Sequence, residues 1–255
     1  MKLARLRIYS CCALLVLFSY SALPQTPASN SAPSLSEKLT YLVEWRLINA
    51  GTATVETARD AAGRGYNLNV HIESAGLVSR LYRVIDSYKV AASERFCLSS
   101  ATLDAQEGKK HVLSKATVDG AQHRLTFDER DLVANKSEKK VLDVAACTFE
   151  ITGALASLRR LNLEPGKSIV IPITDGKKFT QARVTAQSRE KLTVGGKSYA
   201  VTRYEAFLFD GVLYRRKGRL LIWMSDEGDH VPVQFRILLG FPIGTVTVSL
   251  QKQER

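Results

Sequence analysis

Apolar residues alternate with polar ones along many short segments of this chain, and this period of two constrains the fold more than any other feature. Over residues 66–72, for example, Tyr66, Leu68, Val70 and Ile72 alternate with polar residues. Successive side chains of a β-strand point to opposite faces, so the pattern predicts strands with one face on a core and the other in water. The same alternation recurs near both ends of the chain, which is typical of antiparallel sheets.

Turn-forming dipeptides separate the alternating segments. Asp119-Gly120, Gly195-Gly196 and Asp210-Gly211 each tolerate positive φ and predict two-residue hairpin turns. Alternating runs joined in this way predict a meander of roughly 11 to 14 strands. We therefore expect an all-β, mostly antiparallel fold, in which a meandering sheet curls into an open or partly closed barrel or a sandwich.

Two segments depart from the alternation and predict short helices. Residues 151–161 place their apolar side chains on one helical face, and Pro165-Gly166 ends the run. Arg159 and Arg160 lie near the C-terminus of this helix, where cations interact favourably with the helix dipole. The apolar spacing over residues 77–85 predicts one or two further helical turns.

Residues 1–23 have the three parts of a secretory signal peptide. Lys2, Arg5 and Arg7 precede a short apolar run that ends in small residues. We expect export to the periplasm, with retention as an uncleaved anchor as the alternative and no transmembrane segment after cleavage. Cys11 and Cys12 precede most of the apolar run, whereas a lipid-modified cysteine follows it, so we expect no lipidation.

The remainder of the chain predicts a flexible tether and one domain. Residues 24–36 are rich in Pro and Ser and predict the tether, and residues 37–253 predict a single β domain. Hydrophobic residues make up 45% of the sequence and charged residues 24%, which is ordinary for a globular protein and argues against disorder. The net charge of +11 includes three basic residues of the signal, so the mature chain carries about +8.

Two cysteines, Cys97 and Cys147, remain in the mature domain. In an oxidising compartment such a pair predicts a disulfide, and two separate buried thiols are the alternative. In the chain-entropy model, closing a loop of about 50 residues stabilises the fold by on the order of 4 kcal/mol.

Several segments, taken in order, resemble one family of exported bacterial proteins, catalogued as domain of unknown function 3108. The most specific is the run Gly-Val-Leu-Tyr-Arg-Arg-Lys-Gly-Arg-Leu-Leu-Ile-Trp-Met-Ser-Asp over residues 211–226, followed by Val-Pro-Val over 231–233. Segments at 39–51, 81–86 and 155–167 extend the resemblance over about residues 38–252, with departures at Gly228 and over 148–153. The resemblance implies a periplasmic β domain whose biochemical role is not established, with a loose architectural likeness to open-barrel lipoprotein carriers.

No catalytic constellation emerges from the sequence. Neither a G-x-S-x-G nor an H-E-x-x-H motif is present, and we interpret all four histidines (His71, His111, His123 and His230) as surface residues. The acids Asp226, Glu227 and Asp229 suit calcium or glycosidase chemistry, but their spacing is more typical of a solvated turn. We expect no metal, no cofactor and no nucleic-acid partner, and we lean against an enzyme.

The densest basic run contains Arg215, Arg216, Lys217 and Arg219 beside a predicted turn at Lys217-Gly218. Such cations bind phosphates or carboxylates, or alternatively protect a sheet edge from aggregation. Our leading hypothesis is a binding or carrier module that holds an apolar or anionic envelope component, such as a lipid, with this basic run beside the site. The alternatives are a structural module that binds envelope proteins during assembly and a hydrolase with an unrecognised site.

Overall fold

The computed structural model describes residues 36–255, which contain fourteen strands and two helices. The predicted signal peptide and almost all of the predicted tether lie outside the described residues. In chain order the elements are β1 (Ser36–Trp45), β2 (Ile48–Arg59), β3 (Gly65–Ser74), α1 (Gly76–Leu81), β4 (Val84–Ser93), β5 (Leu98–Glu107), β6 (Lys110–Asp119), β7 (Arg124–Asp131), β8 (Lys136–Asp143), α2 (Ile151–Leu158), β9 (Ser168–Thr174), β10 (Phe179–Val194), β11 (Lys197–Phe207), β12 (Gly218–Ser225), β13 (Pro232–Leu239) and β14 (Thr245–Glu254).

All fourteen strands form one antiparallel sheet in the order β8-β7-β6-β5-β4-β3-β2-β1-β14-β13-β12-β11-β10-β9. Except for β8 and β9, consecutive strands of the chain pair with each other, and β1 also pairs with β14, from Lys38↔Glu254 to Trp45↔Val246. The two ends of the described chain therefore meet in the middle of the sheet. The predicted meander is confirmed.

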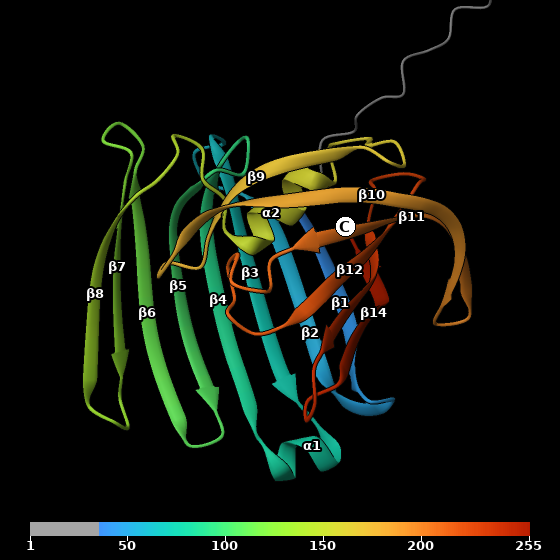
Figure 1. Ribbon diagram of the computed structural model, residues 1–255, viewed down its shortest axis with the longest axis horizontal. Helices are drawn as coiled ribbons and strands as arrows, with labels where there is room; N and C mark the ends of the chain where they lie inside the picture. The colour runs from blue at the N-terminus through green and yellow to red at the C-terminus, as the bar shows by residue number, and fades with distance from the viewer. Residues whose placement is uncertain (1–35) are drawn as a thin grey trace, which may run out of the picture.

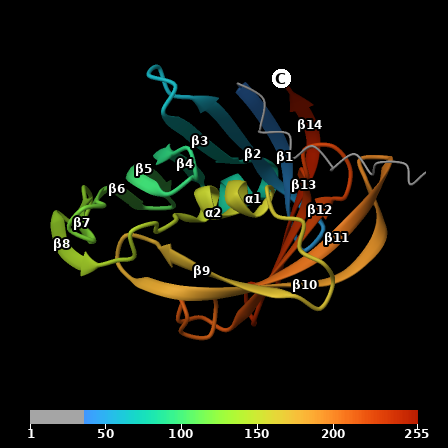
Figure 2. The same ribbon diagram turned by 90° about the horizontal axis from the view of Figure 1, so that it is seen from above.

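The sheet curls around helix α2 without closing (Figures 1 and 2). Its edges are β8 and β9, which the chain connects through α2. Phe149 forms an isolated parallel bridge with Ile173 of β9. Viewed from above in Figure 2, α2 lies between the wall that contains β1 to β5 and the wall formed by β9 and β10. The predicted open barrel with short helices is the observed architecture.

The apolar side chains of the alternating segments are buried on the concave face of the sheet, and the polar ones between them face solvent. Tyr66 and Leu68 of β3 are each 1% exposed, whereas Asn67 and Asn69 between them face solvent. Gly195-Gly196 forms the predicted two-residue turn between β10 and β11. The other two predicted turns belong to longer connections. Asp119 caps the backbone amides of Ala121 and Gln122 in a connection over residues 120–123. Asp210-Gly211 belongs to a connection over residues 208–217 that buries Leu213.

Both predicted helices are present, but α2 is shorter than its apolar pattern suggests. It ends at Leu158, and Leu161 lies 40% exposed in the connection to β9. The amide of Leu161 donates to the Leu158 carbonyl in a tight turn, which directs the chain out of the barrel. No helix of the described residues has both the length and the apolar character needed to cross a bilayer.

Candidate functional site

Helix α2 is held inside the barrel at its N-terminus by the segment that precedes it. A disulfide joins Cys147 to Cys97 at the start of β5, as the sequence predicts. The Leu98 amide donates to the Thr148 carbonyl at 2.7 Å, and the Phe149 amide donates to the Pro172 carbonyl of β9 at 2.9 Å. The segment thus spans the gap between β5 and β9 and delivers the first residue of α2 into the lumen.

The C-terminus of α2 is anchored by two arginines. Arg159 forms a buried bidentate ion pair with Glu37 of β1, with nitrogen–oxygen distances of 2.5 and 3.0 Å. The Arg160 guanidinium lies 4.4 Å from the ring centroid of Phe96 and donates to the hydroxyl of Tyr66 at 3.1 Å. Cations at this end were predicted, and their contacts fix the helix to β1 and to the β4–β5 connection.

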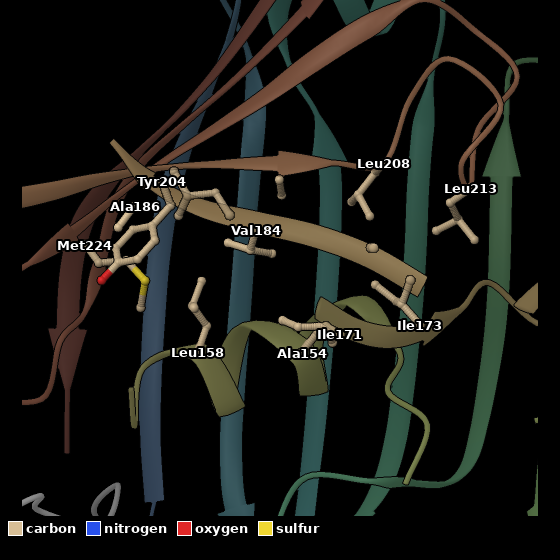
Figure 3. Packing of buried hydrophobic residues seen from close by; sticks show 13 residues of the cluster. Ala154, Leu158, Ile171, Ile173, Val184, Ala186, Tyr204, Leu208, Leu213 and Met224 are labelled. Atoms are coloured by element: carbon tan, nitrogen blue, oxygen red, sulfur yellow. The ribbon is translucent and has the colours of Figure 1, made fainter. Parts of the chain in front are cut away.

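One side of α2 faces an apolar chamber of about 260 Å³. Its walls come from α2, from β9 to β14 and from the connection over residues 208–217, and Tyr214 supplies the only hydroxyl among the lining side chains. Figure 3 shows Ala154 and Leu158 of α2 pointing toward Ile171 and Val184 across this side of the lumen. We call this cavity the apolar chamber.

The other side of α2 faces a second cavity of about 460 Å³, which we call the polar chamber. The concave faces of β3 to β7 form its wall, and the N-terminus of α2, the end of β9 and the β9–β10 turn complete it. Three carboxylates, those of Asp86, Glu150 and Asp175, line it. Ile151 and Tyr214 line both chambers, so the two cavities adjoin at these residues.

Burial changes the acidity of the carboxyl groups in the polar chamber. Desolvation raises the pKa of Glu150 to about 7, although hydrogen bonds from Thr152 oppose the rise. The pKa of Asp86 rises to about 6, first through desolvation and then through the nearby charge of Glu107. Asp86 Oδ1 is buried and has no hydrogen-bond partner among the described residues. The chamber therefore offers hydrogen-bond acceptors in a poorly solvated wall.

The structure separates the four basic residues predicted from the sequence. Arg215, Arg216 and Lys217 are exposed at the end of the connection over residues 208–217, next to Tyr214 of the chambers. Arg219 instead lies on β12, where its guanidinium pairs with Glu205 at 2.7 and 3.0 Å. None of the four side chains lines either chamber; the first three are exposed directly after Tyr214 in the chain, and Arg219 is held by Glu205.

Other candidate residues lie away from the chambers. None of the four histidines lines either cavity. Asp226 accepts a hydrogen bond from Thr202 at 2.5 Å, and Asp229 pairs with Arg255, which places the acidic turn in a structural role. No group of three or more metal-binding side chains occurs among residues 36–255.

Sequence reasoning missed the residues that give the lumen its polarity, above all Glu150, Asp86 and Tyr214. An acid directly before a predicted helix is a capping signal, and Glu150 does accept from the Thr152 amide at 2.9 Å. Its burial depends on the sheet that surrounds it, which no local pattern reports.

The curled antiparallel sheet, the enclosed helix and the divided lumen define a barrel-like all-β protein. The chain belongs to the family described as "Protein of unknown function (DUF3108)", whose model matches residues 40–251. No curated protein matches the sequence.

One solved structure supports the fold. A beta-barrel-like protein of domain of unknown function DUF1849 from Brucella abortus is similar with a TM-score of 0.56 at 11% identity, covering 86% of this chain and 97% of that one. A DUF1089 family protein from Pseudomonas aeruginosa, at 12% identity and 94% coverage of both chains, reaches a TM-score of only 0.25 and supports no argument. At these identities the first likeness establishes the architecture alone.

Proposed function

We propose that this protein is exported to the periplasm and binds an apolar or amphipathic envelope component, such as a lipid, inside its barrel. The observation that carries the proposal is the apolar chamber of about 260 Å³ beside α2. Close packing normally fills the interior of a protein, and an apolar cavity of about 150 Å³ already stays dry and binds benzene. A chamber of this size and chemistry suits the hydrocarbon part of a ligand.

The surroundings of the chamber restrict the polar part of the ligand. Ionised carboxylates in the adjoining polar chamber repel an anion, so a neutral group such as a hydroxyl or an amide is favoured there; it can donate to Asp86 and can accept from Glu150 when that carboxyl is protonated. An anionic headgroup would instead lie outside, near the exposed Arg215, Arg216 and Lys217. The ligand is therefore expected to place its apolar part in the chamber and to carry any negative charge outside it, near these three cations.

The first experiment is native mass spectrometry of the protein purified gently from the periplasm, followed by extraction of bound small molecules. A stoichiometric apolar adduct supports the proposal and identifies the ligand class. The same spectrum reports where the signal is cut and whether the mass lacks the two hydrogens lost in the Cys97–Cys147 disulfide. A clean, empty mass together with a specific protein adduct after periplasmic crosslinking would favour an assembly module instead.

A cavity-filling variant tests the chamber directly. Ala206 is buried in its wall, so Ala206→Phe should occupy the space and abolish binding of the apolar fluorophore N-phenyl-1-naphthylamine. Ala121→Phe adds the same ring on the exposed β6–β7 turn and should bind like the wild type. Thermal melts of both variants establish that they are folded. Equal binding by Ala206→Phe and wild type would remove the apolar chamber as the site.

Hydrolysis is a second candidate function, favoured by one observation. Glu150 is a buried carboxyl whose pKa lies at about 7, and it faces the same chamber as Asp86 and Asp175. A carboxyl group with a raised pKa suits general acid catalysis near neutral pH. Incubating the extracted ligand with wild type and with Glu150→Gln distinguishes the two functions. Addition of water to the ligand by wild type alone indicates a hydrolase, whereas intact ligand from both indicates binding.

A further inference from the structure

Of the eight large apolar side chains of the described chain that are at least 49% exposed, six gather at one end of the barrel, and the other two, Val141 and Val170, lie on the edge strands. In an antiparallel meander, successive connections alternate between the two ends, so the β1–β2, β3–β4, β5–β6, β7–β8 and β13–β14 connections share an end. Figure 1 shows them along the lower end of the sheet, together with α1. We define the apolar rim as six residues of these connections, each at least 49% exposed: Leu47, Leu77, Leu81, Tyr82, Val133 and Phe241.

The opposite end of the sheet differs in composition. Its hairpin connections cover residues 60–64, 94–97, 120–123 and 226–231 and contain no exposed large hydrophobic side chain among the described residues; Leu161, 40% exposed, follows the α2 arginines that contact this end. The only large apolar residues of these four connections, Phe96 and Val231, are buried at 0% and 5% exposure. Exposed apolar residues scattered singly are ordinary on a protein surface, but their concentration at one end marks an interaction site.

Backbone and side-chain contacts join much of the rim into a continuous structure. Trp45 Nε1 donates to the Ile243 carbonyl at 2.6 Å, which links the β1–β2 and β13–β14 connections. The Ala75 amide donates to the Ala50 carbonyl at 2.8 Å and ties the start of α1 to β2. The Gly108 amide donates to the Arg83 carbonyl at 2.7 Å, so the β5–β6 turn continues the rim.

Charge at this end favours an anionic partner. Together with their flanking residues, the five connections carry six cations: Arg46, Arg80, Arg83, Lys109, Lys110 and Lys136. Their acids are Glu107 and Asp131, and Asp131 caps the amides of Val133 and Ala134. Leucine and aromatic side chains among Lys and Arg are the composition with which proteins enter the interface of an anionic bilayer.

The shape of the rim separates a bilayer from a protein partner. The apolar side chains stand on four separate connections, three of them on α1 and the residue after it, with Leu47 88% exposed and Phe241 94% exposed at two narrow turns. Projecting tips suit insertion between lipid headgroups, whereas a protein interface generally presents a closely packed patch with an apolar core. We propose that the apolar rim docks this protein on an anionic phospholipid bilayer surface.

The lumen reaches toward the same end. Ile72 and Asp86, which are register partners, line the polar chamber and lie close to the two ends of the α1 connection. Ile237 lines the apolar chamber two residues before β13 ends at the rim. A protein docked through the rim would thus turn this end of both chambers toward the lipids. The docking itself does not depend on a ligand in the lumen.

Sedimentation with lipid vesicles tests the docking. The mature protein should bind phosphatidylglycerol–phosphatidylcholine vesicles, bind pure phosphatidylcholine vesicles more weakly, and lose affinity as salt rises. The double variant Leu81→Ser, Phe241→Ser should weaken binding to the anionic vesicles by at least about tenfold, because two apolar tips no longer enter the interface. Both residues are exposed, so the fold should survive.

Matched controls make the result decisive. Val141→Ser, Val170→Ser removes two exposed apolar side chains from the edge strands β8 and β9, each 61% exposed, and should leave vesicle binding unchanged. Ala206→Phe should also bind vesicles normally, which separates docking from ligand binding in the lumen. Absence of binding by wild type, or an equal loss in the edge-strand control, overturns the proposal. Concentration-dependent dimers that the rim variant alone abolishes, without vesicle binding, would assign the rim to a second copy.

Discussion

Glu150 combines two roles that usually occur at separate residues. Its carboxylate caps α2 by accepting from the Thr152 amide at 2.9 Å, and it also lines the polar chamber while only 5% exposed. A capping carboxylate on the surface is stabilising in its charged form. Here the barrel removes water from the same group, so desolvation dominates and the pKa rises to about 7.

Stability should therefore depend on pH through Glu150. The folded-state pKa of Glu150 lies above the ordinary value of 4.5. Protonation of Glu150 therefore contributes its full amount to the free energy of unfolding below pH 4.5, and this contribution is lost as the pH rises through about 7. Between these limits the wild type should lose on the order of 3 kcal/mol of unfolding free energy relative to Glu150→Gln. Denaturant unfolding over a pH series measures the difference.

Glu164→Gln is the matched control for this titration. Glu164 is exposed and pairs with Arg189 at 3.0 Å, and such surface pairs contribute about 1 kcal/mol or less. Its unfolding curves should follow those of the wild type at every pH. If the unfolding free energies of the wild type and Glu150→Gln change with pH in parallel, Glu150 is solvated in the folded protein.

Helix α2 is unusual because the β-sheet curls around it. Eight residues are too few for an isolated helix, so its stability must come from packing. Helix α2 closely approaches the β4–β5 connection at Gly153, where an added Cβ would lie 2.8 Å from the Phe96 carbonyl oxygen. That contact is shorter than packing tolerates, and glycine is the residue that permits it.

Gly153→Ala should therefore destabilise the protein although alanine is the better helix former. Helix propensity favours the change by about 1 kcal/mol, but displacing the β4–β5 backbone should cost more, for a net loss of about 1–2 kcal/mol. Thermal unfolding measures the loss. Gly120→Ala is the control, because a Cβ there meets nothing within 4 Å. A more stable Gly153→Ala variant would show that α2 can move away from this connection.

For the whole molecule, the seam between the edge strands β8 and β9 determines how open the barrel is. Lys177 of the β9–β10 turn crosses this seam and pairs with Glu129 of β7 at 2.6 Å and with Glu138 of β8 at 3.3 Å. Gly176 beside it contacts the ring of Phe127, since an added Cβ would lie 2.5 Å from that ring. Side chains, not a strand ladder, hold this end of the seam together.

Lys177→Met should loosen the seam without unfolding the protein. Partly exposed ion pairs contribute about 1 kcal/mol or less each, so the melting temperature should change little. Hydrogen exchange should become several-fold faster in β8 and the adjoining β7, because local opening requires less free energy. Lys139→Met removes a pair with Asp128 that lies within the sheet and should leave exchange at the seam unaffected. Unchanged exchange in Lys177→Met would show that the seam is held elsewhere.

The site was predictable only where its signals are local. The basic run at residues 215–217 is visible as a sequence cluster, and its three residues are exposed directly after Tyr214, whose side chain lines the lumen; their role as a binding site stays a prediction. Arg219 was grouped with it, but its pairing with Glu205 depends on the register of β11 with β12. Asp86 and Glu150 are 64 positions apart in the printed sequence and meet in one chamber only because the sheet curls.

The sequence by itself determined the antiparallel meander and the two helices, because alternation and turn residues are local properties, and it favoured the pairing of Cys97 with Cys147 over two free thiols. Tertiary structure alone decided where α2 lies, how the lumen divides and that Leu47, Leu81 and Phe241 share one end of the barrel. Those features follow from the curvature of a fourteen-stranded sheet and from contacts between residues distant in the chain. A strand's own pattern reports which face is buried, and it carries no information about what that face encloses.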